Sequence, residues 1–293
     1  MKYLSYILFL CLGKLLALLP LRILYVVSDL LYPIIYYIVK YRKEVVFMNL
    51  HNAFPEKTDK EIEDIAKKFY RHLCDLIVEI VKLLHISHEE ISRRMKYRGP
   101  DPFLEEFEKK KMVLGVLGHY NNWEWGSALG MNGSYQFASI YKPLTNKYFD
   151  KLMIKIRAQF GGELIPMAKT GRVMATYIRD GKLTVFNFIA DQAPGRNEVQ
   201  YWATFLNQDT PVYLGIEKLA LKTHQPVYFG KFIKVKRGYY EAVVEKLCDD
   251  CNDLPPHELT NRHLKALEAA IIEHPEYWLW SHRRWKIKRE DFA

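Results

Sequence analysis

The chain of 293 residues has few cysteines, and it contains no internal repeat, no low-complexity linker and no glycine-rich phosphate loop. Its four cysteines are too few and too scattered for a disulfide framework, which favours a reducing compartment. Cys248 and Cys251 form a CxxC pair, but a structural zinc site needs about four ligands and a second CxxC is missing. We therefore expect no bound metal and interpret the pair as part of a polar turn.

The sequence also lacks a long uninterrupted apolar run. Residues 3–39 are mostly apolar, but charged residues and prolines interrupt them at Lys14, Pro20, Arg22, Asp29 and Pro33. A membrane-spanning helix usually needs about 20 apolar residues in succession. A cleaved secretory signal is excluded because leucine-rich sequence continues past Lys14 without a small-residue cleavage site.

We interpret residues 1–43 as one or two hydrophobic helices that anchor the protein to a membrane. The sequence leaves open whether they lie in the membrane interface or cross the bilayer once. The alternative is a buried helical hairpin of a soluble protein. Basic residues at the end of this segment favour a cytoplasmic position for residues 44–293, which we predict to be a single domain.

Positive charge is in excess over the whole chain. There are 43 lysines and arginines against 34 acidic residues, which gives a formal net charge of +9. Such a balance favours an anionic partner, which could be a lipid head group, a phosphorylated substrate, an acidic protein or a nucleic acid. Hydrophobic residues make up 49% of the chain, enough to bury a substantial core, so disorder is excluded.

The hydrophobic pattern predicts an α/β fold. Thr58 and Glu61 form a capping box before a long amphipathic helix that ends near Leu84. Beyond it, short apolar runs alternate with helical stretches: strands are predicted at 112–117, 136–141 and 183–189, and helices at 120–131, 146–159 and 170–180. This alternation indicates a largely parallel central sheet flanked by helices. A long loop at 191–211, a helix at 212–222, a hairpin turning at 236–238 and a helix at 257–273 are predicted to follow.

A histidine followed five residues later by an acidic residue can supply a general base and the group that orients it. By itself the spacing is uninformative, because four of the ten histidines satisfy it: His51, His85, His119 and His263. Only His119 follows a buried-strand pattern and precedes a predicted helix. At such a junction His119 and Glu124 could face one another, whereas in a straight helix residues five apart point about 140° away from each other. The carboxyl end of a parallel strand is also where α/β sheets place their ligands.

Several further blocks support this interpretation by resemblance. The segment GHYNNWEWG (118–126) resembles the HxxxxD/E block of the glycerolipid acyltransferase superfamily, and in particular the late lipid A acyltransferases, which transfer lauroyl or myristoyl chains. Five further segments resemble other elements of that family, in the same order: NLHNAFPE (49–56), YKP (141–143), KTGRVMATYIRDG (169–181), DQ (191–192) and PEYWLWSHRRWK (275–286).

The resemblance implies a bacterial acyltransferase on the cytoplasmic face of the inner membrane. The donor would be an acyl carrier protein, the acceptor a Kdo-bearing lipid A precursor, and no cofactor would be needed beyond the phosphopantetheine arm of the donor. His119 would remove the proton from an acceptor hydroxyl, and Glu124 would orient the imidazole. Alternatives are a different bacterial acceptor, namely a glycerophospholipid, a mannosylated lipid or an aminoacyl lipid, or a non-catalytic membrane-associated lipid-binding protein.

Candidate substrate-binding residues are Asn122, Lys142, Lys169, Arg172, Asp191 and Gln192. Lys169 and Arg172 are three residues apart and share a helix face suited to a phosphate, although solvated surface charges would have the same spacing. Lys142 replaces the arginine of the family's YRP block, which keeps the charge but loses the bidentate fork. The basic and aromatic C-terminal tail suits a membrane or an anionic substrate, and no nucleic-acid partner is expected because no binding module accompanies it.

Overall fold

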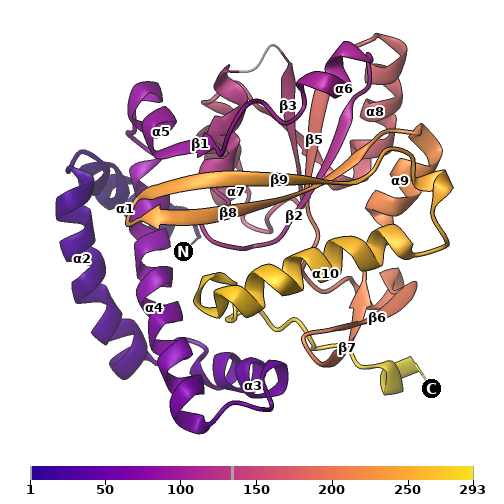
Figure 1. Cartoon of the computed structure of the whole chain (residues 1–293). Coiled ribbons are helices and arrows are strands. Elements are labelled where there is room, and N and C mark those ends of the chain that lie inside the picture. The colour runs from indigo at the N-terminus through magenta and orange to yellow at the C-terminus, as the bar shows by residue number, and fades with distance from the viewer. Residues whose placement is uncertain (1, 133–134, 293) are drawn as a thin grey trace.

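A seven-stranded sheet forms the centre of the computed structural model, which describes residues 2–132 and 135–292 (Figure 1). Its strands run in the order β1 (Met95–Tyr97), β9 (Tyr239–Cys248), β8 (Val227–Lys236), β2 (Val113–Leu117), β5 (Thr184–Ile189), β3 (Gln136–Tyr141) and β4 (Glu163–Pro166). Neighbouring strands are parallel except β8 and β9, which form an antiparallel hairpin. The predicted α/β fold with a largely parallel sheet is confirmed.

Helices cover both faces of this sheet, and most of them lie where the sequence predicts. They are α4 (Asp59–Lys82), α5 (His88–Arg94), α6 (Leu104–Glu108), α7 (Lys147–Ala158), α8 (Thr170–Arg179), α9 (Gly215–Thr223) and α10 (Glu258–Glu273). The capping box at the start of α4 is formed by Thr58 and Glu61. The turn of the predicted hairpin contains Gly238 at a φ of +75°, a conformation that glycine adopts without strain.

Two predicted elements differ in the structure. The helix expected at 120–131 begins only at Trp125 and is a 3₁₀ helix, η2 (Trp125–Asn132), because the residues after His119 form an irregular turn. The long loop expected at 191–211 contains a separate antiparallel pair, β6 (Tyr201–Phe205) and β7 (Gln208–Val212). Pro211 lies in β7, and a proline ordinarily argues against a strand.

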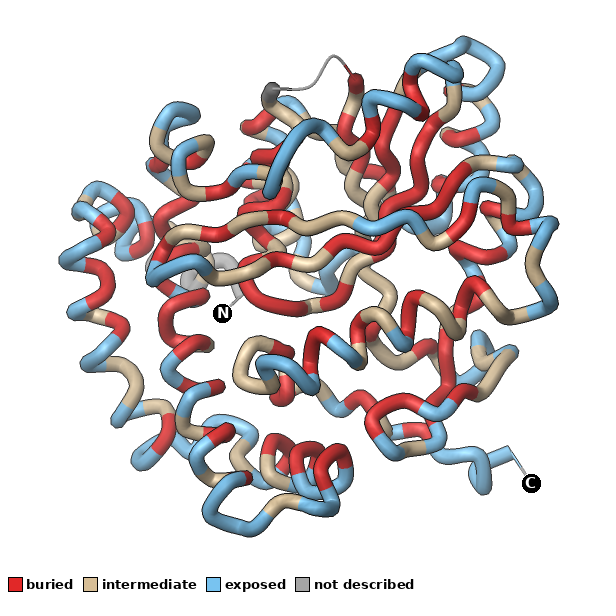
Figure 2. Tube along the Cα trace, viewed as in Figure 1, coloured by how far each residue is buried: buried red, intermediate tan, exposed pale blue. Residues whose placement is uncertain are grey.

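The N-terminal residues form two hydrophobic helices, α1 (Lys2–Ala17) and α2 (Leu21–Pro33), followed by a π-helical segment, η1 (Ile34–Val39). Among the described residues, one helical stretch, Leu21–Val39, is long and apolar enough to cross a membrane, with a mean hydropathy of 1.5. It lies beside α4, and exposed residues alternate with buried ones along it (Figure 2). Asp29, which interrupts the apolar run, pairs with Arg237 at 2.6 Å.

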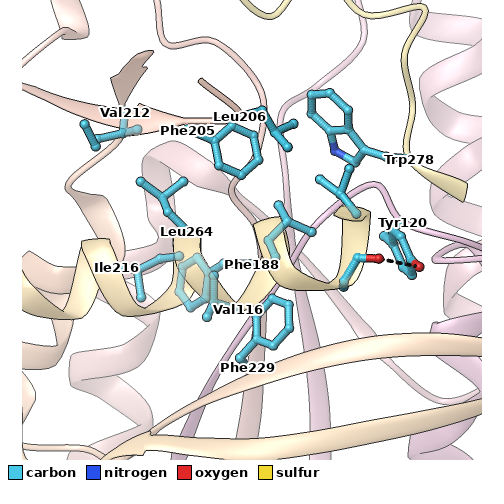
Figure 3. Packing of buried hydrophobic residues seen from close by; sticks show 14 of the residues in the cluster. Val116, Tyr120, Phe188, Phe205, Leu206, Val212, Ile216, Phe229, Leu264 and Trp278 are labelled. Atoms are coloured by element: carbon cyan, nitrogen blue, oxygen red, sulfur yellow. Dashed lines mark hydrogen bonds between the residues drawn. The ribbon is translucent and has the colours of Figure 1, made fainter. Parts of the chain in front are cut away.

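The two faces of the central sheet differ in character because successive side chains of a strand point to opposite sides. Even-numbered residues of β2 and β5, such as Val116 and Phe188, are buried beneath α10 together with Phe229 of β8 and Leu264 of the helix (Figure 3). Odd-numbered residues face the other side, where Gly115 and Leu117 line a cavity. One face therefore carries the larger core cluster, and the other carries a second cluster, which includes Val113 and Val185, together with the cavity.

The C-terminal segment packs against α3 (Lys43–Ala53). The side-chain amide of Asn49 donates to the backbone oxygens of Trp280 at 2.8 Å and His282 at 2.9 Å. Arg42 donates to the backbone oxygen of Ser281 at 3.0 Å. Two sequence blocks more than 200 residues apart are thereby joined.

Candidate active site

Side chains of a strand alternate between the two faces of the sheet, and this alternation also determines where the two central residues of the site lie. His119 follows Leu117 by two positions, and Asp191 follows Ile189 by two, so both continue the cavity-facing rows of β2 and β5. These strands are parallel neighbours in which Leu117 is paired with Ile189. His119 and Asp191 therefore emerge side by side at the carboxyl edge of the sheet.

Asp191 holds His119 by both its backbone and its side chain. Nδ1 of His119 lies 2.6 Å from Oδ1 of Asp191, and the backbone N–H of His119 donates to Oδ2 at 2.8 Å. The indole N–H of Trp278 also donates to Oδ2 at 2.8 Å. With Nδ1 donating its proton to the carboxylate, Nε2 is left as the unprotonated nitrogen that can accept a proton.

The carboxylate of Asp191 is almost completely buried, and its side chain is only 2% exposed. Burial alone would raise its pKa, but the attraction and hydrogen bonds of His119, together with the bond from Trp278, lower the pKa to about 2. Asp191 is therefore ionised at neutral pH and stabilises a charged imidazolium. The His119 side chain is 19% exposed, so a substrate can reach it.

Glu124 does not orient His119, and that prediction is wrong. Its carboxylate binds Arg157 of α7 through two hydrogen bonds, at 2.6 Å and 2.9 Å, and accepts the indole N–H of Trp123 at 3.2 Å. The irregular turn after His119 directs Glu124 toward α7 instead of back to the imidazole. Both Glu124 and Arg157 nevertheless line the same cavity as His119, so Glu124 remains at the site as the partner of a cation.

A cavity of about 640 Å³ opens at His119 and extends beneath η2 along the sheet. Polar and charged side chains line it, including Lys142, Arg157 and Gln192. Its apolar lining includes Leu117, Leu129, Phe137, Ile189, Phe232 and Val244. Its size is within the usual range for small-molecule sites, and its polarity suits a ligand with a polar end and an apolar chain.

The other predicted substrate-binding residues fall into two groups. Gln192 and Lys142 line the cavity, and the Gln192 amide lies 3.2 Å from Nε2 of His119. Asn122, Lys169 and Arg172 do not line it: Asn122 is buried behind the turn, and the two cations are exposed at the start of α8. These positions give no support to direct contact of the three with a ligand in the cavity.

Three residues of the site were missed from the sequence. Arg157 lies on a predicted helix, and its spacing from Glu124 carries no local signal. Trp278 is buried in the core, and its indole N–H also binds Asp191, a contact between positions 87 residues apart. Asn187 lines the cavity with its Nδ2 buried and without a hydrogen-bond partner, and a polar residue at the centre of an apolar strand was the available signal.

No cluster of three or more His, Cys, Asp or Glu side chains that could hold a metal ion occurs in the described ranges. Cys248 and Cys251 are buried free thiols. The groups at the site itself are an imidazole with a buried carboxylate behind it, nearby cations and a largely apolar cavity.

Comparison with known proteins agrees with this geometry. A model of the bacterial lipid A biosynthesis acyltransferase family matches residues 1–287. Lipid A biosynthesis acyltransferase 2 of Shigella flexneri is 21% identical over 251 residues, which covers 84% of this chain and 78% of that protein. The lipid A biosynthesis myristoyltransferase of Escherichia coli is 21% identical over 237 residues, covering 80% and 72%. A lipid A biosynthesis acyltransferase of Haemophilus influenzae is 20% identical over 240 residues, covering 79% and 72%. Because the family model covers nearly the whole chain, the chain belongs to the bacterial lipid A biosynthesis acyltransferase family.

Proposed function

We propose that the protein transfers a fatty-acyl chain from the thioester of an acyl carrier protein to a hydroxyl of a Kdo-bearing lipid A precursor. The observation that carries the proposal is that His119, paired with Asp191, lines a largely apolar cavity. A base alone would suit many hydrolases. A base that lines a largely apolar cavity suits a substrate whose reacting carbonyl ends a hydrocarbon chain.

In the proposed reaction, Nε2 of His119 takes the proton of the acceptor hydroxyl while its oxygen attacks the thioester carbonyl. Asp191 stabilises the imidazolium that results. The tetrahedral intermediate then collapses, the carbon–sulfur bond breaks, and the thiolate leaves and takes up the proton from the imidazolium. The products are an ester and the free thiol of the phosphopantetheine arm, and no other cofactor takes part.

Positive charge near the base supports the same reaction. Lys142 and Arg157 both line the cavity, and Arg157 uses only two of its five N–H donors on Glu124. The remaining donors can stabilise the oxyanion of the tetrahedral intermediate or a phosphate of the acceptor. We assign Glu124 the role of holding Arg157 in this position.

The anchor segment supports a location at a membrane surface. One side of α1, α2 and η1 packs on the protein, and the other side exposes large apolar residues, among them Leu12, Leu15, Leu18, Ile23, Val26, Leu30 and Ile38. The inner side of α2 is tied by polar contacts, including Ser28 to Asp75 at 2.8 Å. We propose that these helices lie in the cytoplasmic interface of the inner membrane, where the amphiphilic acceptor is found.

The test is an acyl-transfer assay with purified protein in detergent. Acyl carrier proteins carrying chains of graded length are incubated with a Kdo-bearing lipid A precursor, and the product mass is measured. Addition of one acyl chain by the wild type, and none by His119→Ala, is expected. A product formed only with a glycerophospholipid, mannosylated lipid or aminoacyl lipid would move the acceptor to that class. Full activity of His119→Ala would contradict the mechanism.

A further inference from the structure

The turn between His119 and η2 rests on a buried carboxylate that the proposed reaction does not use. Glu79 of α4 is 0% exposed, and among the residues that the structure describes it forms no ion pair. Its oxygens instead accept hydrogen bonds from Tyr25 at 2.7 Å, Asn122 at 2.6 Å and Tyr240 at 2.8 Å. A buried carboxylate is costly unless donors satisfy it, and here three neutral donors converge on it.

Asn122 connects this carboxylate to the turn through both ends of its amide. Nδ2 donates to Glu79, and Oδ1 accepts the backbone N–H of Trp125 at 3.1 Å, which begins η2. The indole N–H of Trp125 in turn donates to the backbone oxygen of Glu79 at 3.2 Å. The two partners fix the orientation of the amide, because a flipped amide would present the wrong atom to each of them.

Besides the turn, the same carboxylate links α4 to two other elements. Tyr25 lies on the hydrophobic helix α2, Tyr240 lies on β9, and Glu79 itself lies near the end of α4. Burial raises the pKa of Glu79 to about 7, and the hydrogen bonds from Tyr25 and Tyr240 oppose that rise. The turn after His119 is thus held against α4, α2 and β9 through one side chain.

We propose that Glu79 is a positioning residue for acyl transfer: through Asn122 it fixes the turn that carries His119 and Glu124, and through Tyr25 it joins this turn to the membrane-facing helix α2. The inference rests on the proposed function, and it goes beyond it by placing part of the catalytic geometry outside the cavity. A displacement of about 1 Å at a reacting group can lower the rate by about 100-fold.

The decisive variant is Asn122→Asp, which keeps the shape of the side chain but replaces its NH₂ group with an oxygen. That oxygen would face Oε2 of Glu79, acceptor against acceptor, while the other oxygen can still accept from Trp125. Above the pKa of Glu79 we expect kcat to fall by about 10- to 100-fold, while KM for the acceptor stays within about twofold. Amide hydrogen exchange over residues 119–125 should become faster than in the wild type.

The double variant Glu79→Gln with Asn122→Asp exchanges donor and acceptor between the two positions. The amide introduced on α4 would donate to the new carboxylate in the turn, whose second oxygen still accepts from Trp125, while the Tyr240 hydroxyl can turn to accept. We expect kcat to return to within about threefold of the wild type, as a reversal of a pairwise interaction predicts. Glu79→Gln alone can keep its amide oxygen at the position of Oε2 and turn its NH₂ toward Tyr25, whose hydroxyl can turn to accept, so its kcat should stay well above that of Asn122→Asp.

A matched control is Glu217→Gln. Glu217 is also a buried glutamate with three hydrogen bonds, to the backbone N–H of His257 and to the N–H and hydroxyl of Thr260. It is expected to lower the melting temperature and leave kcat within about twofold.

Wild-type kcat in Asn122→Asp, or a double variant no more active than Asn122→Asp, would overturn the proposal. If Asn122→Asp does not fold, Asn122→Ala removes the same hydrogen bond, and its wild-type kcat would overturn the proposal equally. Absence of transfer by the wild-type protein would contradict the proposed function, whereas hydrogen exchange would still report whether Glu79 holds the turn.

Discussion

The two faces of the central sheet are built from the same strands but have different roles. On the face beneath α10, Val116, Phe188 and Phe229 are buried in the larger core cluster, and none of the three lines the cavity. On the other face, Gly115 and Gly230 line the cavity, and a Cβ at either would lie 2.6 Å from the side chain of Asn187 or Leu117, respectively. The site lies on this second face, so substitutions a single residue apart should have different consequences.

The largest effect should follow from Asp191→Asn at the edge of the face that carries the cavity. An amide group facing Nδ1 of His119 would favour the tautomer with its proton on Nε2, which cannot act as a base. We expect kcat to fall by about 10²- to 10⁴-fold. The assay is acyl transfer at saturating substrate, with the melting temperature measured in parallel. Near-wild-type turnover would show that Asp191 only terminates the strand.

The face beneath α10 is tested by Phe229→Ala, which removes a side chain that is 3% exposed. Its loss should lower the free energy of unfolding by about 3–5 kcal/mol, because the surroundings close only part of the space left. Chemical denaturation measures this change. Since Phe229 points away from the cavity, kcat of the folded variant should stay near wild type, and a specific loss of kcat would break the division between the faces.

A third test measures how the free energy of unfolding depends on pH, and it concerns Glu79, which lies behind the turn after His119. The pKa of Glu79 is raised from 4.5 to about 7, so the folded state favours its protonated form. Its contribution to stability is therefore present below pH 4.5 and is lost as the pH rises through 7. We expect the wild type to lose about 3 kcal/mol relative to Glu79→Gln over this interval. Parallel pH profiles of the unfolding free energy would contradict this.

The smallest effect, on selectivity, should come from Gly230→Ala. A Cβ there would lie 2.6 Å from Cδ2 of Leu117, so the leucine must move within the cavity wall. We expect the ratio of kcat/KM for longer over shorter acyl chains to fall by about tenfold. Gly215→Ala is the control, because nothing lies within 4 Å of its added Cβ, and it should leave the ratio unchanged. An unchanged ratio in Gly230→Ala would mean that this part of the cavity wall does not determine the preferred acyl-chain length.

Strand positions and their alternation could be predicted from the sequence, and with them the face on which His119 and Asp191 lie. The order of the strands could not be, because local hydrophobicity does not say that β2 and β5 are neighbours. The five-residue spacing therefore suggested Glu124 as the partner of His119, and the long-range pairing with Asp191 was missed. Arg157 illustrates the same limit, since its bond to Glu124 depends on how α7 packs and not on sequence distance.

The hydrogen-bonded contact between Asn49 and the segment around Trp280 has a consequence for the order in which the site forms while the protein is synthesised. Asp191 needs the indole of Trp278, and that indole belongs to a stretch synthesised after every strand of the central sheet. On the ribosome, α3 and the sheet emerge long before the residues that complete the catalytic pair. The first helices are therefore synthesised while the indole that binds Asp191 is still missing, and the His119–Asp191 site is complete only after residues 278–282 have left the ribosome.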